Sequence, residues 1–166
     1  MTDTQAEGRE LDLSCLDHLL GFKTSLADAR LRRAFHHRMK PLKLRPVDFT
    51  ILLVLANNEA VSQKLLCQAL DISAPGLAVI LDRLQERALL VRERNELDKR
   101  EHRLLLTDAG LALARKAEKL SQGVEADVLD SLTPDEVDTL AYLLNKLLYG
   151  AERVSRRAQA AAVSAS

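Results

Sequence analysis

The chain has 166 residues, of which 47% are hydrophobic but only 3% are aromatic, and its formal net charge at pH 7 is zero. A chain of this length forms one domain, or one domain with an extension. The scarcity of aromatic side chains means that Leu, Ala and Val must fill the core, which favours helices over a β-sandwich. The balanced charge argues against a histone-like basic protein, although a local basic patch can still attract DNA.

The cysteines and the N-terminus indicate the compartment. Cys15 and Cys67 are far apart in the sequence and do not have the spacing of a metal site, a usage typical of a reducing compartment. No N-terminal run is apolar and long enough for a signal peptide or a membrane span. We therefore expect a cytoplasmic protein with no membrane association and no cofactor. Residues 1–10 are polar and are predicted to be disordered.

Residues 11–45 predict a long N-terminal dimerisation helix, which runs from Leu11 to Lys40 and stops at Pro41. Its apolar stripe consists of Leu16, Leu19, Leu20, Ala27, Leu31, Ala34 and Phe35. The stretch from Arg30 to Arg45, named here the basic segment, contains no acidic residue and seven basic ones: Arg30, Arg32, Arg33, Arg38, Lys40, Lys43 and Arg45. Two interpretations stay open for it, namely a solvated helix face, or a helix end that flanks DNA or binds an anionic ligand.

Residues 46–107 have the element order of a winged-helix lobe. Two short helices, over about 46–57 and 62–69, precede a tight turn. A third helix follows, capped by Ser73, and a change in the hydrophobic period then predicts two short strands around a polar, basic tip. Helix, short helix, turn, helix and hairpin follow one another in this order in winged helix-turn-helix DNA-binding modules.

The third helix of this lobe is predicted to read DNA and is named here the reading helix. Its buried face has three- and four-residue spacing and consists of Leu77, Ile80, Leu81, Leu84 and Ala88. The opposite face carries Pro75, Val79, Asp82 and Glu86. The basic residues of the hairpin suit phosphate or minor-groove contacts. The predicted DNA-contacting residues are Ser62, Gln63, Lys64, Ser73, Pro75, Gly76, Ala78, Val79, Arg83, Arg92, Arg94, Asp98, Lys99, Arg100 and Arg103.

Residues 108–150 predict two C-terminal dimerisation helices. Thr107 and Asp108 cap the first, expected over about 109–129, and the run Thr133-Pro134-Asp135-Glu136 is a strong start for the second. The second is apolar on a wide face, formed by Val137, Leu140, Leu143, Leu144, Leu147 and Leu148. Gly150 is expected to end it, and residues 151–166 predict a flexible tail. Apolar helices at both chain ends favour a homodimer, which would place two reading helices on a palindromic duplex.

Several motifs resemble those of the MarR family of bacterial regulators, over residues 11–149. The most specific is Asp98-Lys99-Arg100 followed by Leu104-Leu105-Leu106-Thr107-Asp108-Ala109-Gly110, which is similar to the family's wing signature. The segment Leu81–Arg87 resembles the end of the family's recognition helix, and Leu20-Gly21-Phe22 resembles its first helix. The resemblance implies a mainly α fold with a small β-hairpin wing: a winged helix-turn-helix with N- and C-terminal dimerisation helices.

The resemblance also implies an obligate homodimer that binds a palindromic DNA operator, usually as a repressor that a small aromatic or phenolic ligand releases. In the wing, it implies that Asp98 orients Arg100, which reaches the minor groove. A carboxylate two residues from a guanidinium can fix the direction of that group. From the residues alone, the alternative is an exposed ion pair worth under about 1 kcal/mol.

The reading helix departs from the family's pattern. Many members carry hydroxyl or basic side chains on the exposed early turns of this helix, whereas the run from Ser73 to Val79 offers few donors to base edges. Base recognition would then rest on Ser73, on apolar contacts with thymine methyl groups, and on DNA shape. The apolar contacts would come from Pro75, Ala78 or Val79.

The resemblance places an effector pocket between the dimer helices and the DNA-binding lobe. The predicted ligand-binding residues near that junction are Phe22, Ser25, His36, Arg45 and Phe49. The two phenylalanines would line an aromatic pocket, and the three polar side chains could hold a carboxylate or a phenolate. The alternative is that the two phenylalanines belong to the core and that the polar groups are solvated.

Other functions have weaker support in the sequence. No phosphate-binding loop, nucleophile elbow or zinc-protease motif is present, and we expect no enzyme. A metal site built from Cys15, His18, His36 and His37 is disfavoured, because these residues lack a clear helical register. A cysteine-based redox sensor is an alternative, although Cys67 is expected to be buried and inert. A protein-interaction module that has lost sequence-specific DNA binding is another alternative.

Overall fold

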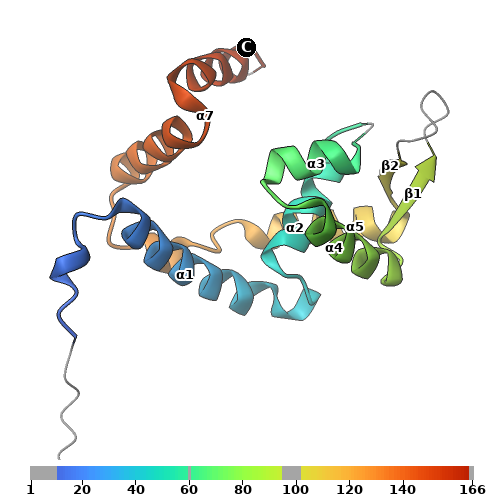
Figure 1. Cartoon of the computed structure of the whole chain (residues 1–166), viewed down its shortest axis with the longest axis horizontal. Coiled ribbons are helices and arrows are strands. Elements are labelled where there is room, and N and C mark those ends of the chain that lie inside the picture. The colour runs from blue at the N-terminus through green and yellow to red at the C-terminus, as the bar shows by residue number, and fades with distance from the viewer. Residues whose placement is uncertain (1–10, 60, 95–101, 165–166) are drawn as a thin grey trace, which may run out of the picture. The chain divides into compact units, whose positions relative to one another are not determined.

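The computed structural model describes residues 11–59, 61–94 and 102–164, with only the backbone at residues 94, 102 and 151–164 (Figure 1). The chain forms two compact units, residues 1–124 and 125–166. The elements of the first unit are η1 (Ser14–Leu16), α1 (Leu20–Met39), η2 (Lys40–Leu42), α2 (Pro46–Ala56), α3 (Gln63–Leu70), α4 (Ala74–Glu86), β1 (Leu90–Arg94), β2 (His102–Leu106) and α5 (Asp108–Ser121). The second unit contains α6 (Ala126–Leu129) and α7 (Pro134–Ser164). The expected disorder of residues 1–10 lies outside the described residues.

The N-terminal helix is shorter than the sequence predicts, because α1 begins at Leu20 and not at Leu11. The backbone N–H of Ser14 donates a hydrogen bond of 2.9 Å to the carboxylate of Asp12, and this bond lowers the pKa of Asp12. Local bonds of this kind stabilise turns in competition with a helix. The 3-10 turn η1 therefore takes the place of the start of the predicted helix.

The three helices of the lobe begin and end close to their predicted positions. The Ser62 hydroxyl oxygen accepts from the backbone N–H of Leu65 at 3.3 Å, and Ser73 does the same for Gly76 at 3.3 Å. These are the N-cap bonds that serine forms at helix starts. On α4, the predicted core residues Leu77, Leu81 and Leu84 are fully buried. Ala88 is exposed instead, because α4 ends before it and the chain turns there with a φ of 54°.

The hairpin is antiparallel, with a register that pairs Leu90 with Leu106 and Arg94 with His102. Its base is attached to the lobe, because the Leu104 N–H donates to the Val61 carbonyl at 2.9 Å. Thr107 joins the hairpin to the end of α4 and caps α5: its hydroxyl donates to the Ala88 carbonyl at 2.7 Å and accepts from the Gly110 N–H at 3.0 Å.

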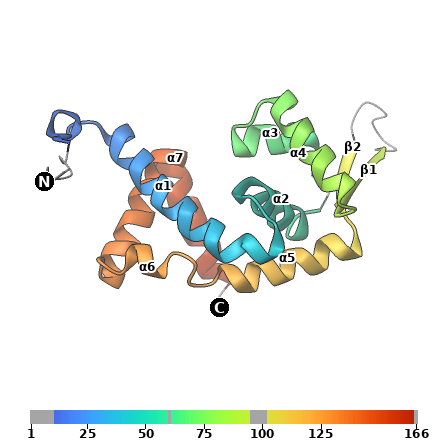
Figure 2. The ribbon, with the colours of Figure 1, turned by 90° about the horizontal axis from the view of Figure 1, so that it is seen from below.

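Gly110 explains one position of the wing signature in physical terms. A Cβ at this position would lie 1.9 Å from the backbone oxygen of Leu89, a distance that no side chain tolerates. Only glycine therefore allows α5 to start this close to the end of α4. From there α5 packs against α2 and α1 and buries Ala114 and Ala117 completely (Figure 2).

The C-terminal part differs from the prediction in two places. The helix expected over about 109–129 is divided, because α5 ends at Ser121 and Gly123, with a φ of 71°, separates it from α6. Gly150 breaks α7 as predicted, with φ 73° and ψ 161°, but residues 151–164 are helical. The alanines of this segment have high helix propensity, and the flexibility predicted for residues 151–166 stays a prediction.

Across the described ranges, no single helix is both long and apolar enough to cross a membrane. Taken together, α3 and α4 have the length and apolar composition of a membrane span, but the pair is bent between its two helices.

Candidate nucleic-acid interface

The start of α3, the helix α4 and the hairpin contact one another and form one side of the lobe (Figure 1). On α4, Ser73, Pro75 and Val79 are exposed, while Gly76 and Ala78 are half-buried. Val79 is 65% exposed although Leu77 and Leu81 are fully buried. The structure thus divides α4 into the two faces that the sequence predicts, with its first two turns open to solvent.

Arg83 lies at the edge between the buried and exposed faces of α4, with its side chain 26% exposed. Its guanidinium forms a short ion pair with the carboxylate of Asp48 on α2, which is 1% exposed. The second oxygen of Asp48 accepts from the backbone N–H of Arg45 at the start of α2, at 3.2 Å. Because a buried carboxylate without its partner is costly, this pair gives Arg83 a structural role, and its predicted contact with DNA stays a prediction.

Arg92 joins the wing to α4. Its guanidinium lies 2.6 Å from the Asp82 carboxylate, and its side chain is 28% exposed. The pair fixes Arg92 beside the exposed face of the reading helix and offsets the negative charge of Asp82 there. A prediction of DNA contact by Arg92 is compatible with this place, but its first partner is a protein carboxylate.

The remaining predicted contacts lie at the start of α3 and in the wing. Lys64 is exposed, Ser62 and Gln63 are half-buried, and the backbone of Ser62 pairs with that of Arg103 on β2. The structure therefore brings the start of α3 and the base of the wing together. The side chain of Arg94, and the whole of Asp98, Lys99 and Arg100, lie outside the described residues.

Similarities to known proteins bear on this site. Residues 42–101 match the model of the MarR family. The transcriptional repressor CouR, solved on a 23-mer DNA duplex, is 35% identical, with a TM-score of 0.77 over 84% of this chain and 99% of that one. CouR bound to p-coumaroyl-CoA is 33% identical, with the same TM-score of 0.77 and the same coverage of 84% and 99%. Apo MarR from E. coli is 28% identical, with a TM-score of 0.68 over 78% of this chain and 96% of that one.

The chain belongs to the MarR family. It is therefore a winged helix-turn-helix transcriptional regulator, as its motifs predict. In this MarR-family chain α4 is the recognition helix and the β1–β2 hairpin is the wing. The predicted mainly α fold with a small β-hairpin is confirmed.

Within the subunit, the five predicted ligand-binding residues are spread along α1 and the start of α2. Phe49 packs edge-to-face against Phe35, with ring centroids 5.2 Å apart, and Phe35 in turn contacts the ring of His36 at 6.4 Å. Phe22 lies 13 residues before Phe35 on α1, a helical rise of about 20 Å. Phe22 is therefore too far from Phe49 to share a small site with it, and Ser25 and Arg45 are exposed. Phe35, at the centre of this cluster, was not among the predicted ligand-binding residues, because its place in the apolar stripe suggests a dimer contact.

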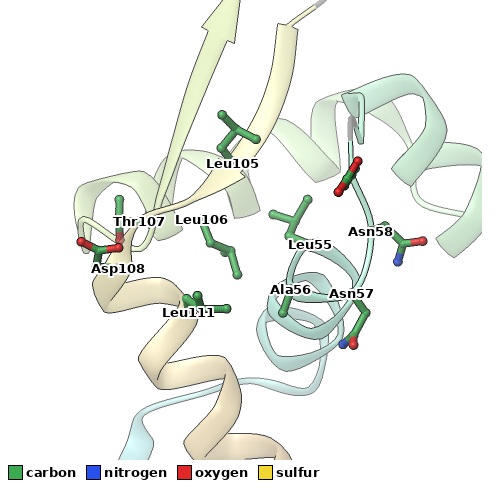
Figure 3. A pocket seen from close by; sticks show the side chains of 10 residues that line it. Leu55, Ala56, Asn57, Asn58, Leu105, Leu106, Thr107, Asp108 and Leu111 are labelled. Carbon is green, nitrogen blue, oxygen red and sulfur yellow. The ribbon is translucent and has the colours of Figure 1, made fainter.

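One pocket of about 540 Å³ lies between the end of α2, the end of β2 and the start of α5 (Figure 3). Leu55, Leu106 and Leu111 point into it, and Asn57 and Asn58 stand at its edge. The two amide groups donate to carbonyl oxygens of α2, at 2.9 and 2.8 Å, and so end that helix. None of its lining residues was predicted. The residues that line it include no cationic side chain, which would favour a carboxylate or a phosphate.

The cysteines occupy different environments. Cys15 is exposed, and Cys67 is half-buried against the core of the lobe, so that it is less buried than expected. Within the part of the chain that the structure describes, no three His, Cys, Asp or Glu side chains form a group that could hold a metal ion.

Proposed function

We propose that this protein is a homodimeric repressor that binds a palindromic operator through α4 and the wing and is released by an aromatic acid, a phenol or the corresponding CoA thioester. The observation that carries the proposal is the similarity, over 84% of the chain, to a repressor solved on a DNA duplex. The elements that would meet DNA are those that the chain exposes on one side of its lobe.

The dimer is supported by the apolar surface of the C-terminal unit. α7 exposes five leucines within nine residues: Leu140, Leu143, Leu144, Leu147 and Leu148. A contiguous exposed stripe of this kind is unusual in a monomer and marks an interaction surface. In a twofold dimer, such a stripe packs against the same stripe of the second copy. The two reading helices are then presented to two half-sites.

DNA binding is supported by the charges around the exposed tip of α4. Lys64 at the start of α3 and Arg103 at the base of the wing flank the reading helix, and Arg92 lies beside it. Contacts of such cations with phosphates position a protein on DNA without reading its sequence. The affinity should accordingly fall steeply as the salt concentration rises.

The proposed effector class is supported by the charge of the surface next to the aromatic cluster of Phe35 and Phe49. All seven basic residues of the basic segment are exposed, and the segment includes Phe35, which packs on Phe49. CouR was solved with p-coumaroyl-CoA, which combines a phenolic ring with phosphate groups. A surface that offers aromatic rings beside exposed guanidinium groups suits such an anion. The ligand releases DNA only if it prefers the dimer that does not fit the operator.

The test starts from DNA that lies upstream of the gene for this protein. A duplex that the protein binds is selected from this DNA, and binding to it is measured by gel shift. We expect a salt-sensitive shift that p-coumaroyl-CoA or an aromatic acid reverses. Arg33→Ala with Arg38→Ala should weaken this reversal, and Arg115→Ala with Lys116→Ala, at exposed positions of α5, serves as the matched control. Absence of any shift would favour a protein-interaction module.

The redox alternative is separated by a Cys15→Ser, Cys67→Ser double variant. We expect this variant to keep its response to the anionic ligand. If peroxide releases the wild type from DNA and the double variant no longer responds to anything, the protein is a redox sensor and the effector part of the proposal is wrong.

A further inference from the structure

We infer that α4 recognises bases by apolar contact: Val79 would pack against the methyl group of a thymine in the major groove of each half-site. The inference rests on the proposed function, because it concerns what the DNA-binding surface reads. It makes Val79 a specificity-determining residue.

The exposure of Val79 has no explanation within the subunit. The side chain is 65% exposed, two residues from the fully buried Leu77 and Leu81. Valine lowers helix stability relative to most residues, and at this position it gains no burial in return. Its Cβ branching fixes the orientation of its methyl groups, so little conformational entropy is lost when they meet a partner. A rigid apolar knob on the recognition helix is therefore suited to contact another apolar group.

The polar side chains of α4 are already engaged or badly placed for reading bases. Ser73 caps the helix, Arg83 pairs with the buried Asp48, and Asp82 pairs with Arg92. The exposed Gln85 lies at the last turn, whereas the N-terminal residues of a recognition helix meet the base edges. The bidentate Arg–guanine and Asn–adenine contacts are thus not available from the first turns of α4.

The apolar residues of the first turns form one patch. Pro75 and Val79 are four residues apart and lie side by side on the helix surface, with the half-buried Ala78 at its margin. Of the features that base pairs present in the major groove, the thymine methyl group is the one that an apolar patch recognises. The patch therefore predicts thymine at one position or more of each half-site.

The charges on the same side of α4 determine which end of the helix can approach DNA. Asp82 and Glu86 continue the stripe of Pro75 and Val79 towards the C-terminus, and phosphates would repel both carboxylates. Arg92 offsets the charge of Asp82 only. The helix therefore has to enter the groove by its N-terminal end, which also carries the positive pole of its dipole. This end holds the apolar patch.

The experiment replaces each thymine of the selected duplex by uracil, one symmetric pair at a time, and measures the dissociation constant. Uracil lacks only the methyl group. At the contacted position we expect about fourfold weaker binding per half-site, the factor for one methyl-sized group returned to water. 5-Bromouracil, whose bromine takes the place of the methyl group, should restore the affinity.

Two variants assign the contact to the side chain. Val79→Ala should bind the thymine and uracil duplexes equally. Val79→Thr keeps the shape but replaces one methyl group by a hydroxyl, and it should lose most of the preference. Val91→Ala is the matched control, since Val91 is 40% exposed on the wing, and a wing in the minor groove cannot reach a methyl group. It should keep the preference of about fourfold per half-site.

The outcomes separate this inference from the proposed function. A duplex that binds with strong salt dependence but is indifferent to uracil at every position overturns the apolar readout and leaves the repressor intact. A thymine preference that survives in Val79→Ala also overturns it. If no duplex binds, the proposed function fails first.

Discussion

The helices α4 and α7 are both amphipathic, and they differ in what covers their apolar faces. In α4, Leu77, Leu81 and Leu84 are fully buried by the lobe, and one large apolar side chain, Val79, is left in solvent. In α7, five leucines between Leu140 and Leu148 are at least 39% exposed. The folded lobe buries the apolar face of α4, whereas nothing described in the C-terminal unit covers the leucines of α7.

This difference separates two kinds of exposed apolar surface. A single side chain such as Val79 presents too little area to hold a protein partner, but it is large enough to meet one methyl group of a base. A stripe of leucines on one helix can contribute to an interface of the size that stable dimers need. We therefore assign α7 to the second copy of the chain and Val79 to DNA.

The largest effect is expected from charges placed in the α7 stripe. Leu143→Glu with Leu147→Glu, four residues apart on one face, should prevent dimer formation because two acids from each copy would be buried together. Analytical ultracentrifugation should show a monomer, and operator affinity should fall by about 100-fold or more, since one half-site is lost. Lys146→Glu, at a neighbouring polar position, should remain dimeric; a monomeric control would show that any acid on α7 is harmful.

The next effect concerns the two ion pairs that start from neighbouring residues of α4. Asp48→Ala leaves Arg83 inside the lobe without its partner and should lower the free energy of unfolding by about 3 kcal/mol. Asp82→Ala removes the more exposed pair with Arg92 and should cost less than about 1 kcal/mol. Urea denaturation of both variants measures the difference, and equal costs would show that the buried pair is not structural.

A smaller effect is expected from the wing tip on DNA binding. Arg100→Ala should weaken operator binding by about 1–3 kcal/mol if the side chain enters the minor groove. Asp98→Ala should act in the same direction through the lost orientation of Arg100. Fluorescence anisotropy with the selected duplex measures both. Variants that stay dimeric and bind like the wild type would remove the wing tip from the interface.

The smallest effect concerns the start of α7. The Glu136 carboxylate accepts hydrogen bonds from the backbone N–H and the hydroxyl of Thr133, at 2.8 and 2.9 Å, and these bonds lower the pKa of Glu136 below its ordinary value of about 4.5. A lowered folded-state pKa stabilises the protein above pH 4.5, and this contribution is lost as the pH falls through the folded pKa. Glu136→Gln cannot titrate. The difference in melting temperature between wild type and variant should therefore be constant near neutral pH and shrink below about pH 4.

Local features of the fold were predictable from the sequence because they depend on neighbouring residues. Ser62 and Ser73 cap their helices as predicted, and the buried leucines of α4 follow from their spacing. The predicted start of α1 was wrong. The prediction there depended on the apolar stripe alone, and the hydrogen bond between Asp12 and Ser14 stabilises a turn in place of the helix.

The candidate site was less predictable, because its decisive contacts join residues that are distant in the sequence. The sequence predicts that Arg83 contacts DNA, but it does not show the ion pair of Arg83 with Asp48, which is 35 residues away. Phe49 was expected to share a pocket with Phe22, yet it packs on Phe35. Hydrophobic periodicity assigns a side chain to one face of its helix, but it does not identify the residue that the side chain contacts there.

We propose that two copies of this chain bind one duplex through α4 and the wing. The most direct test is a titration of the selected duplex at several salt concentrations, with stoichiometry from analytical ultracentrifugation. We expect one dimer per palindromic duplex and a logarithm of the binding constant that falls linearly with the logarithm of the salt concentration. Binding by a monomer, or an affinity that does not change with salt, would contradict the account.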